Sequence, residues 1–365
     1  MKRSKLELKY KPDFDYAKEM WNHYWAKEVL KRPLVVANVV KQEGKTVDKD
    51  KYKYYNACTK NYREQLTIID EWLDNTLFLA ESIPCFSPSH GPDQFAAMLG
   101  ADLKFSESSK TTNWVEPIVE NWEEFIPKIK LNENNSVWQS LLEYSKILKE
   151  HSKGKYLVGI CDFYSNADML SAIRSPAKLC MDFYDYPESI AKAMLSVRKL
   201  YKTVYNSLYE AGGMNNETGT IGWIPFWCKD KYATIQCDFI CMVSPKIANE
   251  YIIPALEEEA NFLDHCIYHL DGPGALPHLD NILAIKKIDA IQWIPGDGQP
   301  PQYEWIDVLK KCQKAGKGLQ ILDVTSIDII KKFSKELSPE GLVYCIDVKT
   351  EREVDEITTW LEKNT

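Results

Sequence analysis

The sequence predicts an α/β protein of the (β/α)8 TIM-barrel class, formed as a single domain by residues 1–365. Short apolar runs alternate with amphipathic helical stretches, a pattern typical of parallel strands joined by crossover helices. About eight such runs occur, which favours a closed barrel over an open sheet. Neither a G-x-G-x-x-G nor a P-loop motif follows any run, which disfavours a doubly wound nucleotide-binding fold.

The predicted strands are the apolar runs themselves. They are Leu34–Val40, Asn75–Ser82, Tyr156–Phe163, Thr234–Val243, Cys266–Asp271, Ala290–Pro295, Leu319–Val324 and Leu342–Val348. Each of the last four precedes a segment with helical periodicity. These predicted helices are Leu276–Ile285, Tyr303–Ala315, Ile327–Leu337 and Glu351–Lys363.

Two segments fall outside this alternation. Residues 1–30 place Phe14, Trp21 and Trp25 on one apolar helical face, which predicts an N-terminal helical extension that caps the barrel. Residues 87–154 contain turn-rich stretches, and we expect them to form an insertion over the barrel mouth.

Composition narrows the classes of partner. The net charge of −8 gives no reason to expect nucleic acid or an anionic membrane as a partner. The N-terminal residues are polar and charged, and no apolar run is long enough to span a bilayer. The ten cysteines include no C-x-x-C pair. We therefore expect a cytoplasmic enzyme with free thiols.

The most informative strand end is Tyr268–Gly274. His269 and Asp271 are two residues apart, so on a strand both face the same side, and a Gly-Pro-Gly turn follows them. The C-terminal ends of barrel strands carry the active site. Such a pair can bind a metal, act as acid and base, or simply hold one another in a core.

A second polar pair lies in the Thr234–Val243 run. Gln236 and Asp238 would share one strand face, and we expect both to reach the site. Cys345, near the end of the last run, is either a metal ligand across the mouth or a buried small residue. The candidate substrate-binding residues are Asp162, Trp227, Trp293 and Gln299. Asp168 and Arg174 are interpreted as a supporting ion pair.

At these residues the chain resembles the uroporphyrinogen decarboxylase superfamily, and within it the corrinoid-dependent methyltransferases. The resemblance covers roughly residues 30–360. The stretches that carry it are Gly91–Gly100, Gln236–Pro245, His269–Gly274 and Ile291–Gly296.

The resemblance implies a methyltransferase that acts with a cobalamin-type corrinoid-binding protein and that forms a homodimer. It also implies a zinc site at the barrel mouth. The matching positions here are His269 and Cys345, with Asp271 where the family has a cysteine. The alternatives are a decarboxylase or lyase that acts on a small carboxylate, or a non-catalytic partner in a corrinoid system.

Overall fold

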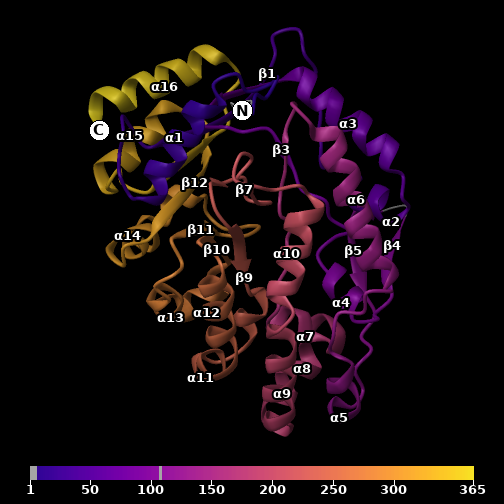
Figure 1. Cartoon of the computed structure of the whole chain (residues 1–365). Coiled ribbons are helices and arrows are strands. Elements are labelled where there is room, and N and C mark those ends of the chain that lie inside the picture. Colours follow the sequence, from indigo (N-terminus) through magenta and orange to yellow (C-terminus); the bar gives the residue numbers. More distant parts are fainter. Residues whose placement is uncertain (1–5, 107–108) are drawn as a thin grey trace.

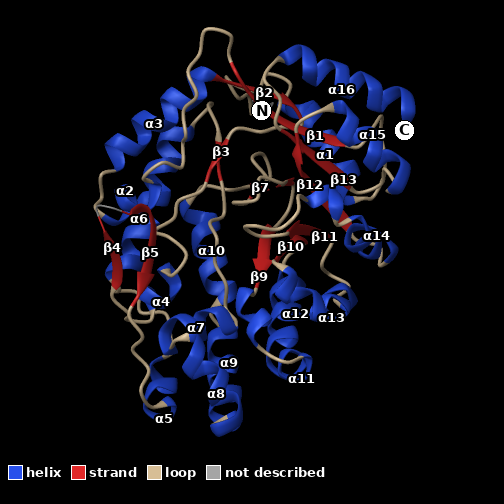
Figure 2. Cartoon of the chain, turned by 180° about the vertical axis from the view of Figure 1, so that it is seen from behind, coloured by secondary structure: helices blue, strands red, loops and turns tan. Residues whose placement is uncertain are grey.

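A computed structural model gives the fold of residues 6–106 and 109–365 (Figure 1). Residues 1–5 of the expected extension and residues 107–108 of the expected insertion lie outside the described residues. The described chain is a mixed α/β protein with one seven-stranded sheet, smaller two-stranded sheets, and helices packed around them (Figure 2).

The seven-stranded sheet has the order β2-β1-β13-β12-β11-β10-β9. All its neighbours pair in parallel except β2 and β1. Its strands are β1 (Leu34–Val40), β2 (Thr76–Ala80), β9 (Tyr232–Gln236), β10 (His265–Asp271), β11 (Ala290–Ile294), β12 (Gly318–Val324) and β13 (Leu342–Ile346).

The predicted alternation of strand and helix is confirmed in the C-terminal part of the chain. Each of the four last strands is followed by one helix: α13 (Leu279–Ala284), α14 (Ile306–Lys314), α15 (Ile327–Glu336) and α16 (Glu351–Asn364). The α13 helix is shorter than predicted because a 3-10 turn that contains Pro277 precedes it. A capping box of Thr350 and Glu353 fixes the start of α16.

The Asn75–Ser82 run differs from its prediction. It forms β2, which pairs antiparallel with β1, with Val36 opposite Ala80. A buried ion pair joins Arg32, which precedes β1, to Glu81, which follows β2, and the Glu81 carboxylate also accepts from the Val35 backbone N–H. The next strand, β3 (Cys85–Phe86), pairs in parallel with β6 (Leu157–Val158) in a separate two-stranded sheet.

The remaining elements are short strands and helices outside the seven-stranded sheet. The short strands are β4 (Leu103–Ser106), β5 (Ser109–Val115), β7 (Thr220–Ile221) and β8 (Trp227–Cys228). The helices are α1 (Phe14–Trp25), α2 (Lys53–Cys58), α3 (Tyr62–Asn75), α4 (Gln94–Met98), α5 (Trp122–Phe125), α6 (Ser136–Ser152), α7 (Ala167–Arg174), α8 (Pro176–Asp185), α9 (Pro187–Arg198), α10 (Tyr201–Ala211), α11 (Pro245–Ile247) and α12 (Ile253–Phe262). No helix among the described residues is long and apolar enough to cross a membrane.

The two faces of the large sheet pack differently. One face, here called the inner face, carries Leu34, Val36, Ile267, Ala290 and Val343, which pack with α1. The other face packs against the surrounding helices. The Trp25 ring of α1 stacks on His265, the first residue of β10, at 4.7 Å between centroids. The α1 helix therefore covers the N-terminal ends of the strands and leaves their C-terminal ends free of it.

Candidate active site

A row of polar side chains crosses the inner face near the C-terminal ends of the strands. In the strand register, Gln236 of β9 lies beside His269 of β10, His269 beside Gln292 of β11, and Gln292 beside Gln320 of β12. His269 and Gln292 follow the inner-face residues Ile267 and Ala290 by two positions, and Gln236 and Gln320 lie beside them in register, so all four point to the same side. The polar row thus lies directly beyond the apolar layer that packs on α1.

Hydrogen bonds link this row to Cys345 of β13. The His269 Nδ1 donates to Gln292 Oε1, Gln292 Nε2 donates to Gln320 Oε1 at 2.6 Å, and Gln320 Nε2 donates to Cys345 Sγ at 3.2 Å. Because Nδ1 carries the proton, Nε2 of His269 keeps its lone pair. A histidine oriented in this way is ready to bind a metal or accept a proton.

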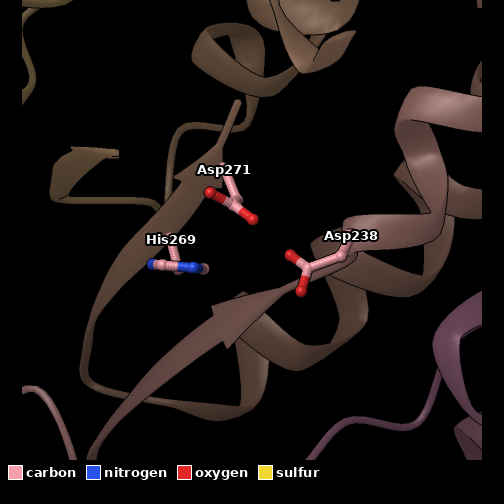
Figure 3. A group of neighbouring side chains, drawn as sticks. All are labelled: Asp238, His269 and Asp271. Atoms are coloured by element: carbon pink, nitrogen blue, oxygen red, sulfur yellow. The ribbon is translucent and has the colours of Figure 1, made fainter. Parts of the chain in front are cut away.

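Three side chains converge at the end of β10 (Figure 3). The candidate ligand atoms of Asp238, His269 and Asp271 all lie within 4.8 Å of one another. His269 is half-buried, and the two aspartates are exposed to solvent. The predicted pair His269 and Asp271 is therefore joined by Asp238, which we had expected at the site but not among the metal ligands.

Asp238 reaches this group from a 3-10 helix and not from a strand. Strand β9 ends at Gln236, and residues Asp238–Met242 form the 3-10 helix η2. The Asp168 carboxylate accepts from the backbone N–H groups of Asp238 and Phe239 at 3.0 and 2.8 Å. Because Asp168 satisfies these otherwise unpaired donors, it fixes the start of η2 and the position of Asp238.

The electrostatics of this group favour a cation. Burial raises the pKa of Asp238; His269 acts against this shift, and Asp271 adds to it. Burial, followed by the charge of Asp238, raises the pKa of Asp168 to about 7. No described lysine or arginine makes an ion pair with Asp238 or Asp271. Like charges held this close gain stability from a bound cation.

Asp162 contributes a further carboxyl to the same region. Its Oδ1 is buried, with no hydrogen-bond partner among the described residues. Burial and then the charges of Asp238 and Asp168 raise the pKa of Asp162 to about 7, against the opposing effect of Lys53. A carboxyl with this pKa can take up or release a proton near neutral pH.

Trp223 is a site residue that the sequence did not reveal. Its ring meets the His269 ring edge-on at 5.3 Å between centroids. Trp223 follows the two-residue strand β7, which is too short to give a strand-end signal in the sequence.

The two tryptophans that we had expected at the wall lie elsewhere. Trp293 follows Gln292 on β11, so it points to the opposite face, where it is fully buried against Trp305 of the surrounding helical layer. Trp227 is buried against Phe14 of α1 and donates to the Thr218 carbonyl. Both are core residues, and this corrects the prediction that one of them walls the site.

Three other residues singled out in the sequence are placed as follows in the fold. Cys345 is not in the convergent group: its thiol accepts from Gln320, three strands from His269, and burial raises its pKa to about 11. Gln299 is exposed in the loop after β11. Arg174 pairs with Asp182 at 2.6 Å and not with Asp168.

The donor set of the group fits a divalent metal ion. Two carboxylates and one imidazole nitrogen are ligands that zinc, iron and manganese accept. Because Asp238 and Asp271 are exposed, an ion held by the group would be accessible to a further ligand. A cavity of about 440 Å³ adjoins the group, and Gln236 and Asp238 are part of its lining. This space could admit a small substrate.

Comparison with known proteins gives a likeness of fold. No family model matches the chain, and no curated protein matches it. A solved structure described as a methyltransferase from Methanosarcina mazei is similar to it, with a TM-score of 0.57 and 11% sequence identity. The match covers 95% of this chain and 98% of that chain, so the likeness of fold extends over nearly the whole chain.

Proposed function

We propose that this chain is a metal-dependent methyltransferase that acts with a corrinoid-binding protein. The observation that carries the proposal is the convergence of Asp238, His269 and Asp271 within 4.8 Å, with Nε2 of His269 left free. The likeness of fold to a protein described as a methyltransferase supports methyl transfer as the reaction class. We also propose that the parallel strands form a closed (β/α)8 barrel of the uroporphyrinogen decarboxylase type.

The metal in this proposal is zinc, held by His269 Nε2 and one oxygen each of Asp238 and Asp271. When bound, it would lower the pKa of the substrate group that accepts the methyl. Two carboxylates neutralise a divalent ion, whereas thiolates also transfer electron density to it. We therefore expect stronger Lewis acidity here than at a thiolate-rich site.

The residues around the group have defined roles in this proposal. Gln292 holds the His269 ring in the tautomer that leaves Nε2 free. Asp168 holds Asp238 through η2. Asp162 receives the acceptor's proton at its buried Oδ1, since its pKa of about 7 lets it change protonation state near neutral pH.

The proposed transfer moves one methyl group to the acceptor and releases one proton from it. The acceptor loses its proton to Asp162, and its freed electron pair forms a bond to the methyl carbon. The corrinoid of the partner protein would supply the methyl group and would keep the electron pair of the methyl–cobalt bond. Asp238 and Asp271 are exposed, which leaves the mouth open to that partner. From the family resemblance alone, we propose a homodimer.

The test uses the purified full chain. Its metal content is measured, and demethylation of methylcobalamin is then followed by absorbance with a panel of thiols, amines and alcohols. We expect activity with at least one acceptor and its loss in Asp238→Asn and His269→Ala. Asp297→Asn, which changes an exposed carboxylate in the loop after β11, is the matched control. Activity that survives in both ligand variants would overturn the proposal.

A further inference from the structure

A second cavity lies beyond Trp223. It has a volume of about 270 Å³, and its lining includes Trp223, Val36 and Cys85. Because Trp223 also contacts His269, one aromatic side chain is shared by this cavity and the convergent group. A molecule in the cavity would therefore lie close to that group.

The charge of this cavity differs from that of the convergent group. Lys49 and Lys53 both line it, and their Nζ atoms contact Asp50 at 2.6 and 3.0 Å. Burial alone would raise the pKa of Asp50, but the two lysines outweigh it and lower the pKa. Two cations around one anion leave one positive charge in the cavity.

The walls strengthen the effect of that charge. The Lys49 ammonium lies 5.5 Å from the ring centre of Trp72 and 5.8 Å from that of Phe86. The side chains of Lys49 and Lys53 are only 27% and 25% exposed. Charges beside apolar walls and partly shielded from water are screened less than charges on an open surface.

Neutral polar groups complete the lining. Asn38, Ser82 and Ser87 are among the lining residues. The indole Nε1 of Trp223 is buried and has no hydrogen-bond partner in the described ranges 6–106 and 109–365. A buried donor without a partner costs free energy, and a ligand oxygen that reaches it would recover that cost.

We propose that this cavity is an anion subsite that binds the carboxylate of a small organic acid with a compact apolar body. Lys49 and Lys53 would supply the charge, and Trp72 and Trp223 the apolar walls. The anion subsite depends on the proposed function in one respect. The bound acid is taken to be the substrate, with its reactive end at the His269 group.

The binding step is tested with benzoate and with benzamide, its neutral counterpart, by isothermal titration calorimetry on the metal-free full chain. We expect benzoate to bind at least about tenfold more tightly than benzamide, and its affinity to fall as salt is added. Equal affinities for the two probes would overturn the subsite.

Variants locate the charge that is responsible. Lys49→Met and Lys53→Met should each weaken benzoate binding by about fivefold or more. Lys45→Met is the matched control, because Lys45 is 68% exposed and pairs with Glu71 outside the cavity lining. Asp50→Asn keeps both lysines and removes the opposing charge, so it should tighten benzoate binding several-fold. Unchanged binding in all three cavity variants would contradict the proposal.

Asp238→Asn separates this inference from the proposed function. The subsite predicts that Asp238→Asn binds benzoate as well as the unmodified chain does, since the lysines are untouched. If the unmodified chain binds benzoate but shows no metal-dependent methyl transfer, the subsite stands and the proposed function fails. Loss of benzoate binding in Asp238→Asn would place the anion at the convergent group and overturn the subsite.

Discussion

Gln292 is the residue that selects the tautomer of His269. The two are direct neighbours in the register of β10 and β11, and Nδ1 of His269 donates to Oε1 of Gln292. The Gln292 amide is itself held by its hydrogen bond to Gln320. The tautomer that frees Nε2 toward Asp238 and Asp271 is therefore fixed by the neighbouring strands.

The first prediction concerns this contact. Gln292→Leu should lower zinc affinity by about 10- to 100-fold, because His269 loses the acceptor that orients its ring. Affinity is measured by competition with a chromophoric chelator. Gln292→Glu retains an acceptor and should restore most of the affinity. A Leu variant that binds zinc as tightly as the unmodified chain would show that Gln292 has no such role.

The second prediction separates the two possible ligand sets. His269→Ala and Asp238→Asn should lose bound metal, whereas Cys345→Ser should keep it, because Cys345 lies outside the convergent group. Metal per chain is measured by mass spectrometry, and circular dichroism checks the fold. If Cys345→Ser loses the metal and Asp238→Asn retains it, the ligand set predicted from the sequence is the correct one.

The third prediction concerns cysteine reactivity. Burial raises the pKa of the Cys345 thiol to about 11, so little thiolate exists at pH 7.5 and alkylation should be slow. Cys241 is exposed and should react with iodoacetamide first. Peptide mass spectrometry over time gives both rates. Faster labelling of Cys345 than of Cys241 would contradict the buried, hydrogen-bonded thiol.

The fourth prediction concerns stability against pH. Burial raises the pKa of Glu259 from 4.5 to about 8, although Ser165 donates to its carboxylate. The folded state therefore favours the protonated form. This contribution to stability is complete below pH 4.5 and is lost as pH rises through about 8.

Glu259→Gln should remove this loss. At about 1.4 kcal/mol per pKa unit, the effect between pH 5 and pH 9 is at most about 4 kcal/mol in the free energy of unfolding. Urea unfolding at both pH values measures it, and Glu257→Gln, which changes an exposed residue of the same helix, is the control. An equal pH dependence in Glu259→Gln and the unmodified chain would assign the effect to other groups.

The fifth prediction tests the core position of Trp293. Trp293→Ala should destabilise the chain by about 3–5 kcal/mol through the cavity it leaves, while zinc affinity stays the same. Trp223→Ala should show the opposite pattern, with a smaller loss of stability and weaker metal binding, because Trp223 packs on His269. Thermal unfolding and metal titration on both variants decide between these outcomes.

The position of each strand along the chain could be largely predicted from the sequence, while its pairing could not. The apolar runs at β10–β13 and their following helices were found because each is a local pattern of five to seven residues. The Asn75–Ser82 run has the same apolar composition, but it pairs antiparallel with β1. Nothing within the run distinguishes these two pairings, because the direction of β2 depends on the path of the chain from β1 through α2 and α3.

Sequence alone determined that His269 and Asp271 share a face and end a strand, because alternation along a strand is a property of the backbone. The same alternation places Gln292 and Trp293, which are consecutive on β11, on opposite faces of the sheet. Which of these faces carries the site had to be known separately. Only the tertiary structure decided that Asp238 completes the group and Cys345 does not. Strand β9 ends at Gln236 because Asp168, far away in the sequence, accepts the N–H groups of η2. The Asp168 carboxylate comes from α7, so its contact with η2 is long-range. No local sequence pattern records such a contact.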